Sequence, residues 1–513
     1  MQEARSNSGI SANIVIGVVA TAWTAIIAIV SVGWFVKLLG IESYGLIGFF
    51  ATMQVAISVL DLGLGSTVNR EVARGVAHGD LSRVGRVVRS LQLIYVMVAL
   101  LIGAVVVACA PFIASHWLGA SSIDQTEIEW SIRLMGVVAA LRWPLGLYQG
   151  ILIGLQRARK SYLVTATMAT VSNIGAIILL YAIHPSLWTY FIWQVAAAVV
   201  TLYWMRRSAR RELGPIIETA HDLRTLRGLL AQSLTISGVA VTGILWSQLD
   251  KIFVSGAVSL ADFGRYSLAT LIAGALTVLL IPTFNVIYPR MSGLVVAGKA
   301  DELITFYRTG SKLLLCALIP ISASSFFYAY DLLHVWTGDE VLAESTAPIV
   351  GLLIIGAAGN GVLNFPYALQ LASGKERMAL SINIGNLATA PIMFFLAARY
   401  GLMGGAIGWL LQASLYFVAN VTLTHAFILK GLTTRWLLKD LTPGILAGVL
   451  LIGAGHALVV LLTDSSILRL VLASAIAVVV GVAIGLGRGD TRRVMLQLYR
   501  DWAGEQIRGR AAA

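Results

Sequence analysis

The feature that most constrains the fold is a succession of apolar segments, each long enough to cross a ~30 Å hydrocarbon layer as a helix. The chain is 58% apolar and 12% charged, whereas soluble domains carry about 25% charged residues. This pattern predicts an all-α polytopic membrane protein, since a helix satisfies its own backbone groups in lipid. We count fourteen segments, near 12–36, 44–66, 90–114, 131–154, 161–183, 186–205, 229–256, 263–288, 308–331, 346–371, 378–398, 402–425, 441–463 and 466–487.

The first segment is too long for the apolar part of a signal peptide, and no small-residue cleavage site follows it. We therefore interpret it as the first membrane span. Two cysteines, Cys109 and Cys316, lie inside apolar segments, and no disulfide is expected between them.

The connecting segments alternate in charge. With the N-terminus placed in the cytoplasm, the inner segments hold 30 of the 37 Lys and Arg residues. The outer loops 115–130 and 332–345 hold acidic residues and no Lys or Arg. This is the positive-inside pattern. It predicts that both termini lie in the cytoplasm, and it explains the net charge of +12 without nucleic-acid binding.

Landmarks recur at a nearly constant offset, which predicts two homologous halves. Chance pairing of common residues is the alternative. An even number of spans per half makes the halves parallel repeats about an axis along the membrane normal. We expect six-helix lobes at 1–210 and 221–430, two additional helices at 431–487, and a basic tail at 488–513 that forms an interfacial helix or frays. The paired landmarks are Glu42 and Asp262, Pro144 and Pro366, Gly154 and Gly374, and Arg157 and Arg377.

The sequence lacks the motifs of nucleotide-binding and metal sites. The chain has no G-x-x-x-x-G-K-[ST] phosphate loop, no H-E-x-x-H and no Cys/His cluster. An ATP-driven pump and a bound catalytic metal are therefore disfavoured. The predicted outer loops are also short for an enzyme that works on a sugar chain. A transporter without a resident cofactor is the expectation.

Charged residues inside the spans mark candidate sites, because each costs roughly 2.5–3.5 kcal/mol or more at the bilayer centre. Arg142 lies nine residues deeper than Arg133, about 13 Å along a helix, which is too deep for snorkelling. It faces either a cavity or a structural ion pair. Asp61 is either a helix-end or cytoplasmic-mouth residue, held by Arg70 or by a neighbouring span, or a transport residue.

Asp250 and Lys251 are adjacent near the predicted outer end of the seventh span. Neighbouring residues on a helix point about 100° apart, so this pair is expected to contact different partners rather than each other. In the tenth and eleventh spans, Asn360, Asn364, Gln370 and Asn383 either line a pathway or join helices by hydrogen bonds.

Three stretches in register carry a family resemblance. They are "LGIESYGLIGFFATMQVAISVLDLGLGSTVNREVAR" (39–74), "LRWPLGLYQGILIGLQRARK" (141–160) and "SQLDKIFVSGAVSLADFGRYSLA" (247–269). Together they resemble the bacterial polysaccharide (O-antigen type) flippases of the multidrug/oligosaccharidyl-lipid/polysaccharide exporter superfamily. The resemblance covers most of residues 10–430.

This resemblance implies two six-helix lobes around a central cavity and a cargo of undecaprenyl-diphosphate-linked oligosaccharide. The flippase would move this cargo from the inner to the outer leaflet of the bacterial inner membrane. Its partners would be membrane lipids and the polysaccharide polymerase and export machinery. Arg142 and Lys251 would bind the diphosphate. Asp250 and Asp61 would bind H+ or Na+ for coupling. The sugar would contact aromatic rings and amides, namely Trp143, Tyr148, Trp246, Asn360 and Asn364.

Three alternatives stay open at this point. A peptidoglycan lipid-precursor flippase also has fourteen spans. A cation-coupled multidrug exporter usually has twelve spans and a more acidic cavity. A membrane glycosyltransferase or polymerase would need a larger structured outer loop.

Overall fold

The computed structural model of the chain describes residues 2–214, 242–243, 247–497 and 500. Within those ranges the secondary-structure elements are helices, as the sequence predicts. The chain divides into two compact units, Met1–Ser267 and Leu268–Ala513. The predicted lobe boundaries at 1–210 and 221–430 stay a prediction.

Unit 1 begins with two spans that are continuous in the chain. Helix α1 runs over Gln2–Ser58, but Gly40 inside it has a non-helical backbone with φ 80° and ψ 165°. Glycine adopts this left-handed region without a steric penalty. The residue therefore separates the first two predicted spans. The remaining elements of the unit are η1 (Val59–Asp61), α2 (Leu64–Ala77), α3 (Leu81–Phe112), η2 (Ile113–Trp117), α4 (Gln125–Arg142), α5 (Leu145–Gly154), α6 (Ala158–Ala182), α7 (Leu187–Leu213), a helical stretch at 247–257, and the start of α9 (Leu260–Gly274).

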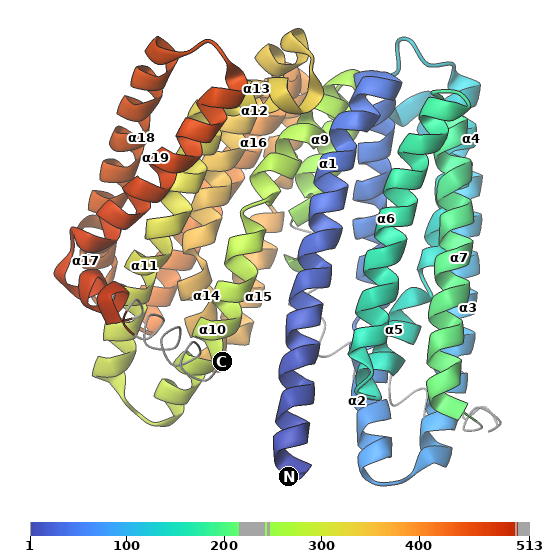
Figure 1. The fold of residues 1–513 in the computed structure, drawn as a ribbon, viewed down its shortest axis with the longest axis horizontal. Helices are drawn as coiled ribbons and strands as arrows, with labels where there is room; N and C mark the ends of the chain where they lie inside the picture. Colours follow the sequence, from blue (N-terminus) through green and yellow to red (C-terminus); the bar gives the residue numbers. More distant parts are fainter. Residues whose placement is uncertain (1, 215–241, 244–246, 498–499, 501–513) are drawn as a thin grey trace, which may run out of the picture. The chain divides into compact units, whose positions relative to one another are not determined.

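Small residues allow the helices of unit 1 to approach closely. Helix α1 packs along α6, α2 packs along α5, and α4 packs between α3 and α7 (Figure 1). A Cβ added at Gly150 on α5 would lie 2.6 Å from the carbonyl oxygen of Gly65 on α2. Helix association in lipid depends on such packing because lipid tails are as apolar as leucine.

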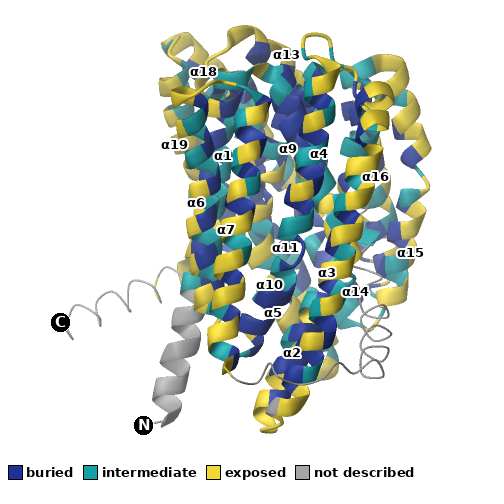
Figure 2. Ribbon diagram, turned by 90° about the vertical axis from the view of Figure 1, so that its right-hand side faces the viewer, coloured by how far each residue is buried: buried dark blue, intermediate teal, exposed yellow. Residues whose placement is uncertain are grey.

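Helix α3 shows how the outer faces are built. Its buried residues include Val84, Val88 and Leu91. Its other face is just as apolar, with Leu100 and Leu101 68% and 62% exposed. Figure 2 shows such exposed residues recurring along the helix. Apolar side chains on both faces are expected when one face contacts other helices and the other contacts lipid.

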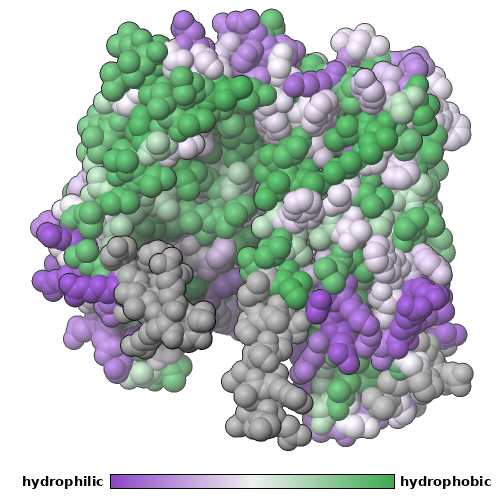
Figure 3. Space-filling view, viewed as in Figure 1, coloured by the Kyte–Doolittle hydropathy of each residue, from purple (hydrophilic) through white to green (hydrophobic). Residues whose placement is uncertain are grey.

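One end of unit 1 gathers the basic segments. Arg157 and Lys160 at the start of α6 both form ion pairs with Glu212 at the end of α7. Figure 3 shows hydrophilic side chains collected where α7 ends and apolar side chains along the helices above. The predicted inner segments 157–160 and 206–211 thus lie at one end, as the charge pattern requires.

Unit 2 repeats the element order of unit 1. The starts of α3 and α11 are Leu81 and Ala300, a difference of 219, and those of α5 and α14 are Leu145 and Asn364, also 219. Gly401, with φ 61°, divides α16 much as Gly40 divides α1. The elements are α10 (Thr277–Val296), α11 (Ala300–Phe327), α12 (Ala329–Thr337), α13 (Glu340–Val362), α14 (Asn364–Ala372), α15 (Glu376–Leu387), α16 (Ala390–Phe427), α17 (Thr433–Arg435), η4 (Trp436–Leu441), α18 (Thr442–Leu462) and α19 (Ser466–Leu486).

Eleven helical segments among the described residues are long and apolar enough to cross a membrane. Two of these segments contain the dividing glycines, Gly40 and Gly401. The predicted seventh span, 229–256, lies mostly outside the described residues. The all-helical polytopic class is confirmed, and the count of fourteen stays a prediction.

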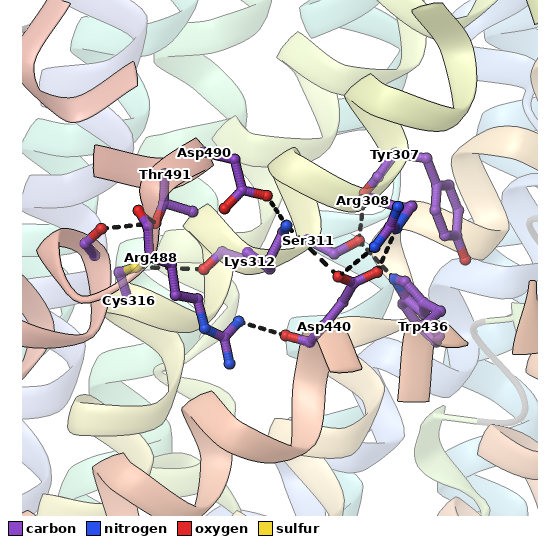
Figure 4. A network of polar contacts seen from close by, with 11 residues as sticks. Tyr307, Arg308, Ser311, Lys312, Cys316, Trp436, Asp440, Arg488, Asp490 and Thr491 are labelled. Atoms are coloured by element: carbon purple, nitrogen blue, oxygen red, sulfur yellow. Dashed lines mark hydrogen bonds and ion pairs between the residues drawn. The ribbon is translucent and has the colours of Figure 1, made fainter. Parts of the chain in front are cut away.

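A buried ion cluster fixes the two additional helices, α18 and α19, to α11. The carboxylate of Asp440, before α18, accepts hydrogen bonds from Arg308 Nε (2.6 Å) and Nη2 (2.9 Å) on α11. Lys312 Nζ lies 3.5 Å from the same carboxylate and also pairs with Asp490 beyond α19. Arg488 donates to the backbone oxygen of Asp440 at 2.6 Å (Figure 4). The start and the end of the helix pair are thus held to one helix.

Candidate functional site

Asp61 lies where a membrane helix of unit 1 breaks. After η1, Leu62 and Gly63 both adopt left-handed backbone with φ 45° and 74°, and α2 then starts at Leu64. The carboxylate accepts a hydrogen bond from the hydroxyl of Tyr95 at 2.6 Å and another from the backbone N–H of Gly65 at 3.2 Å. Tyr95 lies on α3, so a neighbouring span holds the side chain, as one of the sequence alternatives states, and no ion pair among the described residues joins it to Arg70.

Arg142 lies at a second break, between α4 and α5. Pro144 follows two residues later and cannot donate the next backbone hydrogen bond. The guanidinium donates to the side-chain oxygens of Gln54 (3.2 Å) and Gln194 (2.8 Å), and its carbon lies 5.8 Å from the ring centre of Phe50. Among the ion pairs of the described residues, none includes Arg142. Within the described residues, Arg142 is therefore not part of a structural ion pair, which was one of the two alternatives from the sequence.

The two breaks meet at one cavity of about 350 Å³. Its walls combine one acid, one base and several uncharged polar side chains with a few apolar ones. Three of the residues predicted from the sequence lie together there, namely Asp61, Arg142 and Trp143. The full lining is Gln54, Ile57, Ser58, Asp61, Ala139, Arg142, Trp143, Leu145, Gly146 and Gln149.

Unpartnered donors give this cavity a chemical preference. The amide nitrogen of Gln54 and the indole nitrogen of Trp143 are buried and have no hydrogen-bond partner among the described residues. Buried polar groups are normally satisfied, so such donors point to a missing acceptor. Together with a guanidinium that has no carboxylate partner, they favour an acceptor-rich anionic or hydroxylated ligand.

Gln54, Ser58 and Gln149 were not predicted as site residues. Gln54 and Asp61 are seven residues apart, two turns along a helix, so both were expected on one face. That spacing was a usable signal for Gln54. Gln149 follows Arg142 by seven residues in one predicted span, so the same signal was available for it. No comparable signal linked Gln194 to Arg142, because that contact joins different helices.

Other predicted residues lie elsewhere in unit 1. Tyr148 is buried on α5, accepts a 3.4 Å hydrogen bond from Gln92, and does not line this cavity. Asp250 is 2% exposed and accepts from the hydroxyl of Tyr266 at 3.0 Å, while its other oxygen has no partner among the described residues.

Lys251 donates to Gln248 at 3.2 Å and forms no ion pair with Asp250 within the described residues, as helical geometry predicts. Trp246 lies outside the described residues.

The two asparagines predicted for the sugar belong to unit 2. Asn364 donates its amide to the backbone oxygen of Gly361 at 2.8 Å, at the break between α13 and α14. Its observed contact is thus local to the backbone. Asn360 is half-buried, and its side-chain oxygen has no partner among the described residues.

Comparisons with known proteins agree on the class. The family model described as polysaccharide biosynthesis protein matches residues 10–295. A Shigella flexneri protein that carries the name O-antigen transporter is 23% identical over 422 residues, covering 80% of this chain and 94% of that one.

Two solved structures share the fold. The lipid II flippase MurJ, in an inward closed conformation, matches with a TM-score of 0.65 and 14% identity, over 95% of this chain and 100% of that one. A multidrug resistance transporter of the MATE family, in the MOP superfamily, matches with a TM-score of 0.67 and 15% identity, over 81% and 99%.

Proposed function

The chain belongs to the polysaccharide biosynthesis protein family and is a membrane transporter rather than an enzyme, and we propose that it flips a diphosphate-linked oligosaccharide. The cargo is an undecaprenyl-diphosphate-linked repeat unit, moved from the inner to the outer leaflet of the bacterial inner membrane by alternating access. The cavity of Asp61 and Arg142 carries this proposal.

A diphosphate is the part of this cargo that a membrane resists most, because charge is costly in hydrocarbon. A guanidinium forms two parallel hydrogen bonds to phosphate oxygens, and such charge-assisted bonds are strong in a low-dielectric site. Arg142 has this chemistry, and its present amide partners, Gln54 and Gln194, are neutral and exchangeable. The unpartnered indole N–H of Trp143 adds a donor, and its ring a surface for a sugar.

Asp61 supplies a second property, sensitivity to a cation. A cationic side chain in the same cavity stabilises the charged form of a carboxylate. This stabilisation weakens when an anionic cargo binds the cationic side chain. Binding of H+ or Na+ at Asp61 would then be favoured while cargo is bound, and cargo release would favour release of the cation. Asp250, buried against Tyr266, is the second coupling candidate.

The test is complementation of a host that lacks the gene, with lipid-linked sugars measured by mass spectrometry. We expect complete single repeat units on undecaprenyl diphosphate to accumulate without the protein and with Arg142→Gln, and Arg142→Lys to restore part of the flux. Arg133→Gln on the same helix is the matched control. Truncated oligosaccharides would contradict the proposal, and accumulated peptidoglycan precursor would assign the activity to the lipid II class.

A further inference from the structure

Within the described residues, the basic start of α15 in unit 2 forms no ion pair with an acid, unlike its counterpart at the start of α6 in unit 1. In unit 1, Glu212 neutralises Arg157 and Lys160. In unit 2, Lys375 donates to the backbone oxygen of Phe427 at 2.9 Å and lies 5.9 Å from its ring centre. Among the described residues, no ion pair includes Lys375 or Arg377. Glu376 lies between them, and adjacent residues on a helix do not face each other.

A break in the helix accompanies this difference. Helix α6 continues without interruption over Ala158–Ala182. Its counterpart ends at Leu387, and α16 starts only at Ala390. Between the two helices lies a groove of about 680 Å³, within the size range of pockets that hold small molecules. Its walls include Arg377, Ile382, Gly385 and Thr389 on one side and Leu415 and Val418 on the other.

The groove has the length and polarity of one lipid leaflet. Arg377 and Thr389 are twelve residues apart, about 18 Å along the helices, and half of a bilayer core is about 15 Å. The basic group is at the predicted cytoplasmic end, and the wall deeper in is apolar and open, with Leu415 43% and Val418 56% exposed.

We propose that this groove binds one anionic glycerophospholipid of the cytoplasmic leaflet. The phosphate contacts the guanidinium of Arg377 and the remaining N–H groups of Lys375, and an acyl chain lies along Ile382, Leu415 and Val418 toward Thr389. This lipid is a resident of the transporter and is distinct from its cargo. The site stands independently of the proposed function, because its evidence lies in a different unit from Asp61 and Arg142.

Native mass spectrometry of the purified full chain, titrated with phosphatidylglycerol and with phosphatidylcholine, tests the headgroup. We expect phosphatidylglycerol to bind more tightly than phosphatidylcholine. Arg377→Gln should lower the affinity for phosphatidylglycerol roughly fivefold, which is the loss for one Arg charge at an anionic lipid surface. Arg435→Gln removes an exposed basic residue outside the groove and is the matched control. Equal affinity of the two variants would overturn the headgroup assignment.

Filling the groove tests the acyl chain. Gly385 lines the groove, and a Cβ added there meets no atom within 4 Å, so the side chain of Gly385→Leu starts into open space. Gly293→Leu, at another open helical glycine outside it, is the control. We expect only Gly385→Leu to abolish the bound phosphatidylglycerol while both variants keep the parent Tm. Retained lipid in Gly385→Leu, or a lipid diphosphate that binds where phosphatidylglycerol does not, would overturn the proposal.

Discussion

Replacing Asp440 by asparagine tests how the two additional helices are held. Asp440 is 2% exposed and accepts both hydrogen bonds from Arg308, with Lys312 at 3.5 Å. The side chains of Arg308 and Lys312 are only 21% and 7% exposed. An amide keeps the shape and removes the charge, so two poorly hydrated cations lose their common partner.

The expected loss follows from that burial. Breaking a buried ion pair lowers the free energy of unfolding by about 3–5 kcal/mol. For Asp440→Asn we expect a loss of about 3 kcal/mol, because Lys312 keeps its contact with Asp490 and Arg308 is partly hydrated. For a unit of this size, about 2–4 °C per kcal/mol predicts a fall in Tm of roughly 6–12 °C. Thermal unfolding of the detergent-purified protein at one fixed heating rate measures it, since such unfolding is often irreversible.

Two variants make the measurement decisive. Asp490→Asn removes the other partner of Lys312. Because the Asp490 side chain is 47% exposed, the free energy of unfolding should fall by less than about 1 kcal/mol. Replacing Arg308 and Asp440 together by Met and Leu should recover most of the loss, because an apolar pair leaves no unpaired charge. Equal Tm values for Asp440→Asn and Asp490→Asn would refute the reasoning.

Three further outcomes are expected. Gly45→Ala would place a Cβ 2.1 Å from the carbonyl oxygen of Leu260, so it should destabilise the protein by about 1–3 kcal/mol in thermal unfolding. Gly293→Ala, whose Cβ meets open space, should leave the stability unchanged or raise it. Tyr95→Phe removes the 2.6 Å bond to Asp61 and should shift the pH dependence of transport without changing protein abundance, a result that an inert Asp61 would not give. The backbone N–H of Arg83 and the hydroxyl of Ser82 lower the pKa of Asp80. Asp80 therefore stabilises the α3 N-terminus above the ordinary Asp pKa, and this stabilisation is lost as the pH falls through the lowered pKa. Protection factors for amide hydrogen exchange at residues 81–84 should fall in that pH range in the parent and stay constant in Asp80→Asn.

The composition and the spacing of apolar segments determined the membrane class and the helical fold, because in lipid a segment of this length has few alternatives to a helix. They also left Gly40 and Gly401 between predicted spans, whereas the breaks beside Asp61 and at Pro144 lie inside the predicted spans 44–66 and 131–154. Arg142 stood out because an isolated charge in an apolar segment needs a partner or a cavity.

What only the tertiary structure decided is which residues meet. Asp61 and Arg142 are 81 positions apart and come from different helices. Of the two amides at the guanidinium, Gln54 lies two turns before Asp61, and Gln194 comes from a third helix, α7. Asn364 fitted the same sequence criteria as these residues, yet its amide binds the neighbouring backbone. The periodicity of a helix fixes which side chains share its face, but contacts between helices depend on crossing geometry and on small residues at the interface, and one helix alone does not encode these.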